Sequence, residues 1–85
     1  MTRRAEGFSL LNELARLPGV TAVEYSSSGL YVVHRSVGEE TYRVQRVEEG
    51  WVWARLDETW DVLASGLVDR PDTLLARVER WSAYR

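Results

Sequence analysis

Apolar residues near the N-terminus recur at helical spacing, and the polar residues between them fall on the opposite face of the predicted helix. The leucines of this stretch are Leu10, Leu11, Leu14 and Leu17. Their spacing predicts a short amphipathic helix. Ser9 is placed to cap it, or Thr2 if the helix begins earlier. Pro18 disfavours a helical conformation in the residue before it and Gly19 supplies a turn, so the helix is expected to end there.

The middle of the chain divides into short β-rich runs separated by turn residues. In chain order these runs are Val20–Tyr25, Leu30–Ser36, Thr41–Val47 and Trp51–Leu56. Short runs with tight turns between them predict consecutive antiparallel neighbours, a meander. The segment Trp60–Leu67 fits either a fifth strand or a short helical turn, and the strand is favoured because Gly66 ends the segment quickly.

The last element begins at Pro71, a residue favoured in the first helical turn. Asp72 follows it, where a negative charge suits the positive end of the helix dipole. The apolar stripe of this helix consists of Leu74, Leu75, Val78 and Trp81. We therefore predict an α+β fold with an N-terminal helix, a four- or five-stranded antiparallel meander sheet and a C-terminal helix, both helices on one face of the sheet. Residues 1–85 are expected to form a single small domain.

The fourth strand suggests which face of the sheet the helices cover. One side of this strand is purely aliphatic, with Val52, Ala54 and Leu56, whereas the other carries an arginine with two tryptophans. Assigning the aliphatic side to the helices leaves the tryptophan side open. In the third strand, Tyr42 and Val44 should then face the helices. The two sides of the second strand are nearly equal, and the charge of Arg35 favours placing its side outward.

The predicted open face carries aromatic residues and arginines, which are enriched at binding hot spots. Its members are Tyr31, Arg35, Arg43, Trp51, Trp53 and Arg55. We interpret these six residues as a candidate partner-binding surface. The reverse orientation of the sheet, or a cover over the tryptophans supplied by a terminal segment or Trp60, fits about equally well, because tryptophan is usually well buried.

Composition and charge narrow the classes of function. The chain has 85 residues and a formal net charge of −2, which argues against a strongly basic nucleic-acid binder. No apolar run approaches the ~20 residues of a membrane span. No signal-like apolar stretch follows Arg3 and Arg4, so we expect a cytoplasmic protein without membrane association. The chain has no cysteine, which excludes disulfides and thiolate chemistry.

Candidate catalytic and metal-binding groups are sparse. His34 is the only histidine, and the nearby serines are typical turn residues, so no nucleophile–base arrangement is predicted. One histidine without cysteine does not make a structural zinc site. Acidic pairs occur in turns at opposite ends of the third strand, too far apart to share an ion. A looser acidic cluster near Trp60 could attract a cation or a partner's arginine; it consists of Asp57, Glu58 and Asp61.

We therefore predict no catalytic residue, no metal and no cofactor, and expect that the protein is not an enzyme. The favoured function is a small non-catalytic protein-interaction module, such as a regulatory, accessory or inhibitor protein, that uses the Trp/Arg open face to bind an unidentified protein. The alternative is a nucleic-acid-binding module on the same face, with bases stacked on Trp51 or Trp53. A homo-oligomer formed through an edge strand or the same face is the third hypothesis.

Overall fold

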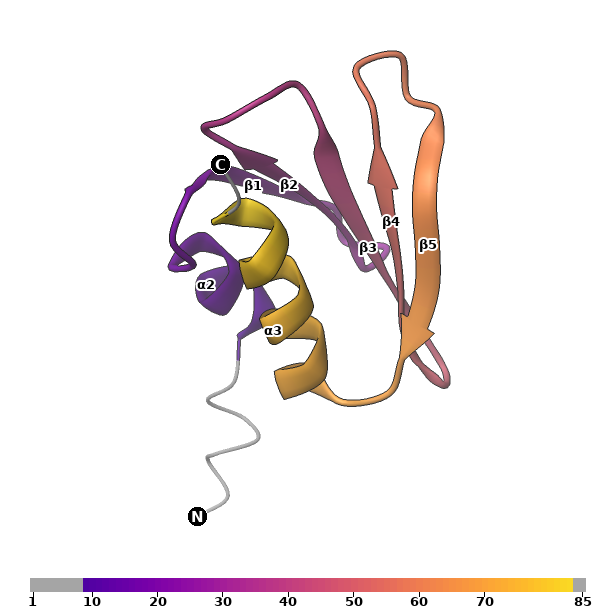
Figure 1. Cartoon of the computed structure of the whole chain (residues 1–85). Helices are drawn as coiled ribbons and strands as arrows, with labels where there is room; N and C mark the ends of the chain where they lie inside the picture. The colour runs from indigo at the N-terminus through magenta and orange to yellow at the C-terminus, as the bar shows by residue number, and fades with distance from the viewer. Residues whose placement is uncertain (1–8, 84–85) are drawn as a thin grey trace.

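The computed structural model describes residues 9–83, and it confirms the predicted order of elements (Figure 1). The elements are α2 (Leu10–Ala15), β1 (Val20–Tyr25), β2 (Leu30–Arg35), β3 (Thr41–Val47), β4 (Gly50–Leu56), β5 (Val62–Val68) and α3 (Pro71–Ser82). The sheet has the strand order β1-β2-β3-β4-β5, and every neighbouring pair is antiparallel. The fold is therefore α+β with a simple five-stranded meander.

Helix α2 starts and stops where local chemistry requires. The backbone N–H of Asn12 donates to Ser9 Oγ at 3.3 Å, so Ser9 is the N-cap. The alternative cap, Thr2, lies outside the described residues. After the helix, Gly19 adopts φ +86°, and a Cβ there would lie 2.1 Å from the carbonyl oxygen of Ser82. Only glycine therefore allows the chain to pass so close to the end of α3.

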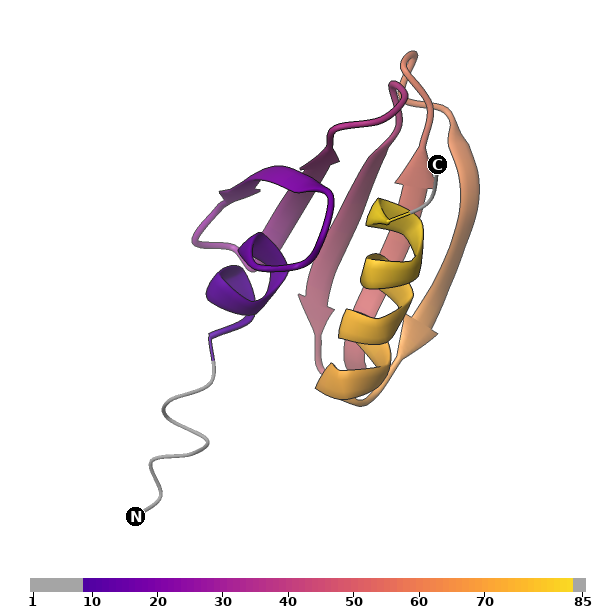
Figure 2. The same ribbon diagram turned by 60° about the vertical axis from the view of Figure 1, so that its left-hand side comes forward.

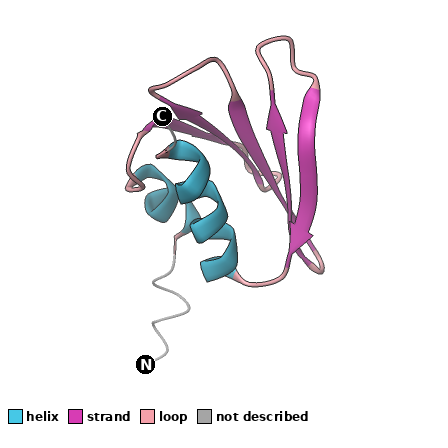
Figure 3. Ribbon diagram, in the orientation of Figure 1, coloured by secondary structure: helices cyan, strands magenta, loops and turns pink. Residues whose placement is uncertain are grey.

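One buried cluster lies between the sheet and the two helices. Its members are Leu10 and Leu14 of α2, Leu74, Val78 and Trp81 of α3, and Val33, Tyr42, Val44 and Trp53 of the sheet. Figures 1 and 2 show both helices on the same side of the sheet. In Figure 3, the other side of the sheet carries no helix of the described part of the chain.

The predicted orientation of the sheet is right for β3 and wrong for β2 and β4. Tyr42 and Val44 face the helices as predicted, and Arg43 lies on the open side. The register places Tyr31 and Trp53 on either side of Val44, and Arg55 beside Tyr42. The helix side therefore carries Tyr31, Arg35, Trp51, Trp53 and Arg55, five of the six residues assigned to the open face.

The reason for this reversal is the balance between apolar area and one charge. Indoles bury far more apolar area than valine, alanine or leucine, so the two tryptophans of β4 outweigh its aliphatic side. The charge of Arg55 does not prevent this because a partly covered arginine is tolerated when it has a carboxylate partner. Glu40 supplies that partner, with Oε1 3.1 Å from Arg55 Nε.

The ambiguous segment after β4 is a strand, as favoured, but it begins two residues later than Trp60. Trp60 lies in the turn, and β5 starts at Val62. Arg55 pairs with Ala64 while the next residue of β4, Leu56, pairs with Val62, so β5 contains a β-bulge.

Neither described helix is long and apolar enough to cross a membrane.

Candidate functional site

Two tryptophans, a tyrosine and two arginines form a continuous stack on the helix side of the sheet. The ring centroid of Tyr42 lies 5.6 Å from that of Trp53 and 5.1 Å from that of Trp81. The guanidinium carbon of Arg77 lies 4.2 Å from the centroid of Trp53, and that of Arg35 lies 4.5 Å from the centroid of Trp81. This arginine–aromatic stack joins β2, β3 and β4 to α3, and its cation–π contacts add to the burial of the rings.

Gly66 of β5 makes room for one end of the stack. A Cβ at this position would lie 2.8 Å from Trp53 Nε1 and 2.9 Å from two carbons of the same indole. The indole therefore lies directly against the backbone of the edge strand. A glycine inside a strand is typical of such close approaches, and it is the sequence feature that could have indicated the side on which Trp53 lies.

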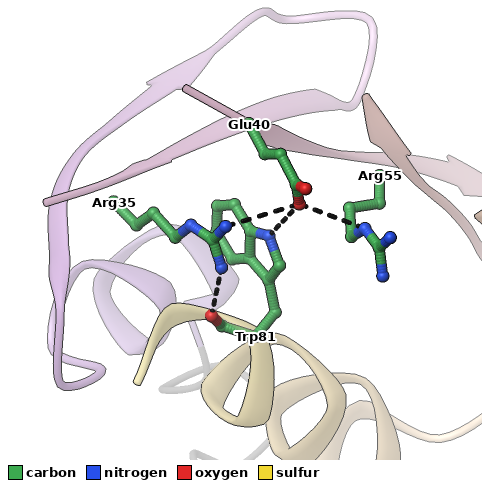
Figure 4. A network of polar contacts seen from close by, with 4 residues as sticks. All are labelled: Arg35, Glu40, Arg55 and Trp81. Atoms are coloured by element: carbon green, nitrogen blue, oxygen red, sulfur yellow. Dashed lines mark hydrogen bonds and ion pairs between the residues drawn. The ribbon is translucent and has the colours of Figure 1, made fainter. Parts of the chain in front are cut away.

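A polar network fixes the other end of the stack, where the β2–β3 turn meets α3 (Figure 4). Glu40 Oε1 accepts a hydrogen bond from Trp81 Nε1 at 3.1 Å and contacts Arg35 Nη2 at 3.4 Å. Arg35 Nη1 also donates to the Trp81 carbonyl oxygen at 2.7 Å. The Arg35 side chain is only 7% exposed. Arg35 therefore acts within the fold, holding the C-terminal turn of α3, where a cation is favoured.

A cleft of about 510 Å³ opens beside the stack. Its lining residues are Arg35, Glu40, Tyr42, Trp53, Arg55, Ala64, Arg77, Arg80 and Trp81. With four arginines against one glutamate, the cleft is cationic on a chain whose formal net charge is −2. The Tyr42 residue is only 2% exposed, and its hydroxyl has no hydrogen-bond partner among the described residues. Burial raises the pKa of Tyr42 to about 12, against the opposing effect of the nearby Arg77.

Most of the exposed large apolar residues lie on the hairpin of β4 and β5. Five of the seven exposed large apolar residues in the described chain lie there: Val52, Trp60, Val62, Leu63 and Leu67. We call these five residues the hairpin surface. Val52 and Leu67 are register partners, 40% and 56% exposed, on the open side of the sheet. The β4–β5 hairpin therefore carries most of the exposed large apolar side chains of the described residues.

The turn of this hairpin holds Trp60 in an unusual conformation. Asp57 Oδ1 accepts hydrogen bonds from Thr59 N at 2.8 Å, Thr59 Oγ1 at 2.7 Å and Asp61 N at 3.0 Å. The bond from the Thr59 side chain is the main cause of the lowered pKa of Asp57. Within this turn Trp60 has φ +69° and is 58% exposed. A bulky residue in the left-handed region is an outlier, and such outliers cluster at functional positions.

Strand β5 is also an edge of the sheet, and it has little protection against pairing with another chain. It is the last strand of the order, and the residues from Val62 to Val68 include no charge and no proline. The other edge, β1, contains Glu24 and a register irregularity, and α2 packs against it. Charges, prolines and bulges are the devices that keep an edge strand from pairing with another chain. Apart from its single bulge, β5 has none of these devices.

The sequence-predicted site residues separate into three places. Arg35, Trp53 and Arg55 meet at the cleft. Tyr31 and Trp51 line a second hollow of about 500 Å³ beside α2. Arg43 alone lies on the open side, as predicted.

The cleft also contains residues that the sequence reasoning missed, namely Glu40, Tyr42, Arg77 and Arg80. The spacing of Arg77 and Arg80, one helical turn apart next to the apolar stripe of α3, was a usable signal. No sequence signal indicated that Trp60 would be exposed.

The remaining candidate chemistry does not assemble into a site. His34 Nε2 lies 2.9 Å from Glu24 Oε2 on the neighbouring strand. Within residues 9–83, no group of three or more histidine or carboxylate side chains is arranged to hold a metal ion. The carboxylates of Asp57 and Asp61 instead accept hydrogen bonds inside the hairpin turn.

Comparison with known proteins adds no functional assignment. No protein-family model matches this sequence, and no characterised protein or solved structure is significantly similar to it.

Proposed function

We propose that the protein is a small interaction module that binds a partner protein through the hairpin surface. The observation that carries this proposal is the concentration of five exposed large apolar residues on one hairpin. Contiguous exposed apolar patches on small domains mark interaction sites, and tryptophan is the residue most enriched at binding hot spots. Trp60, 58% exposed and held outside the ordinary backbone region, is the expected anchor.

The charges around Trp60 indicate the chemistry of the partner. Asp57, Glu58 and Asp61 lie in the same turn as Trp60, and Glu58 and Asp61 are exposed. A partner surface with an apolar pocket flanked by arginine or lysine would complement this arrangement. A second copy of the chain fits less well, because a symmetric contact centred on the turn brings like charges together.

The free edge of β5 supports the same proposal. An extended segment of the partner can add a strand to this edge, gaining main-chain hydrogen bonds while its side chains pack on the hairpin surface. From Ala64 to Val68, beyond the bulge, β5 has neither a charge nor a proline to oppose such pairing.

This proposal keeps the function class predicted from the sequence and changes its surface. The predicted Trp/Arg face does not exist as an open surface, because both β4 tryptophans face the helices. The nucleic-acid alternative required the same face, and of its three arginines only Arg43 lies on the open side. A single arginine on the open side gives little charge for binding nucleic acid, and this supports a protein as the partner of that side.

The proposal is tested with Trp60→Asn and the matched control Val37→Asn. Both residues are exposed, but Val37 lies in the β2–β3 turn, outside the hairpin surface. Proteins retained by each purified variant from a lysate of the source organism, with and without nuclease treatment, are identified, and the candidate partner is then titrated as a purified protein. We expect at least a tenfold loss of affinity for Trp60→Asn and none for Val37→Asn.

Three outcomes would contradict the proposal. Equal retention by Trp60→Asn would remove the hairpin surface from the interaction. Retention that depends on nucleic acid would favour the alternative function. A dimer in light scattering that Trp60→Asn dissociates would replace the partner by a second copy of the chain.

A further inference from the structure

We propose that the cleft beside the arginine–aromatic stack binds a phosphate group, either free or carried by a small molecule. This site is separate from the hairpin surface, and the inference does not depend on the proposed function. It rests on three features of the cleft: guanidinium groups with donors that no carboxylate of the described residues takes up, a buried hydroxyl without a well-placed hydrogen-bond partner, and indoles that already pack against other side chains.

The first feature is the charge. Arg55, Arg77 and Arg80 bring three guanidinium groups to the cleft from β4 and α3. Arg55 contacts Glu40 through Nε alone, and its two terminal nitrogens point away from that carboxylate (Figure 4). No carboxylate within residues 9–83 forms an ion pair with Arg77 or Arg80. Gathering three such cations raises their mutual repulsion, which a multiply charged anion would relieve.

The second feature is the Tyr42 hydroxyl. The residue is 98% buried and lines the cleft; the Arg77 guanidinium lies beside its hydroxyl, but no hydrogen bond of good geometry joins that hydroxyl to Arg77 or to any other described residue. Buried hydroxyls are almost always hydrogen-bonded, so an orphaned one calls for an explanation such as a missing ligand. A phosphate oxygen can accept this hydrogen while its other oxygens accept from the guanidinium groups.

The third feature limits how the ligand is recognised. Tyr42 packs against both Trp53 and Trp81, and an arginine lies over the indole of each tryptophan. Each indole is therefore already in contact with a second ring and a guanidinium group, an arrangement that does not favour stacking of a nucleobase. The guanidinium edges remain available, and they suit a phosphate because arginine can donate two hydrogen bonds to it at once.

The size of the cleft admits more than a bare ion. Its volume of about 510 Å³ lies within the ~300–1,000 Å³ range of small-molecule pockets. Ala64 contributes a short apolar wall, next to which a carrier group could sit. A phosphate monoester of a small molecule is therefore a suitable ligand, as is inorganic phosphate.

The test is isothermal titration calorimetry of the full chain at low ionic strength, with two probes. Inorganic phosphate tests the group alone, and ribose 5-phosphate tests the same group on a non-aromatic carrier. Sodium chloride at matched ionic strength is the reference. We expect saturable binding of phosphate but not of chloride. Equal affinity for the two probes would assign free phosphate, and tighter binding of the ester would assign a carried one.

Variants locate the binding. Arg80 is exposed, so Arg80→Gln should keep the fold, checked by circular dichroism, while weakening phosphate binding at least tenfold. Tyr42→Phe removes only the hydroxyl and should weaken it several-fold. Arg43→Gln is the matched control, because Arg43 lies on the open side, and it should bind as the wild type does. Equal heats for phosphate and chloride, or an equal loss in Arg43→Gln and Arg80→Gln, would overturn the proposal.

Discussion

The two faces of the β4–β5 hairpin contrast in an unexpected way. The face toward the helices carries Trp51, Trp53 and Arg55, whereas the other face carries aliphatic residues such as Val52 and Leu67, which are 40% and 56% exposed. A simple rule that puts aliphatic residues inside and charges outside predicts the opposite. The difference shows that burial follows total apolar area and the satisfaction of polar groups, because Trp53 brings a large ring and Glu40 supplies a partner for Arg55.

The largest predicted effect comes from truncating neighbouring residues on opposite faces of β4. Trp53→Ala removes the ring between Tyr42 and Arg77 and should lower the free energy of unfolding by about 3–5 kcal/mol. Val52→Ala affects a side chain that is 40% exposed and should cost less than about 1 kcal/mol. Urea unfolding measures both. Similar losses of unfolding free energy in the two variants would contradict the register, which places Trp53 on the buried face and Val52 on the open face.

An alkaline titration tests the helix-facing side through Tyr42. Its pKa is raised by burial to about 12, above the ordinary value of 10.0. The unfolded chain therefore loses this proton first as the pH rises. The stability linked to Tyr42 is fully present below pH 10 and is lost as the pH approaches 12.

The expected loss is about 2 kcal/mol, which is measurable by denaturant unfolding across that pH range. Tyr42→Phe should flatten this dependence, but not remove it, because burial also raises the pKa of Tyr31. An unchanged pH profile in Tyr42→Phe would show that Tyr42 ionises freely and that its ring is more accessible than the packing indicates.

The same contrast explains how far sequence reasoning reached. Element order, the strand bounds of β1 and β3, the Ser9 cap and the start of α3 at Pro71 are local properties, and the sequence predicted them. The orientation of β2 and β4 is not local. It depends on Gly66 facing Trp53 across the register and on Glu40 reaching two arginines, contacts between residues that only the folded sheet brings together.

The candidate sites were missed for the same reason. The sequence pointed to arginine and tryptophan as the functional residue types, and three of the six named residues do meet at the cleft. They meet on the helix side, however, where α3 adds Arg77 and Arg80. The hairpin surface had no such signal, since valine and leucine in alternating strands are expected in the core.

The smallest predicted effect concerns the turn that exposes Trp60. A left-handed conformation costs an ordinary L-residue roughly 1–2 kcal/mol, and asparagine tolerates it better. Trp60→Asn should therefore leave the free energy of unfolding unchanged or raise it by about 0.5–1 kcal/mol, because an indole that is 58% exposed contributes little packing. Thermal and urea unfolding measure this directly. A loss of stability would mean that the Trp60 indole stabilises the hairpin. Trp60 would then have a structural role, as Trp53 has on the helix-facing side. A gain would mean that the fold tolerates strain at Trp60 for a reason other than stability, which is the behaviour expected of a binding residue.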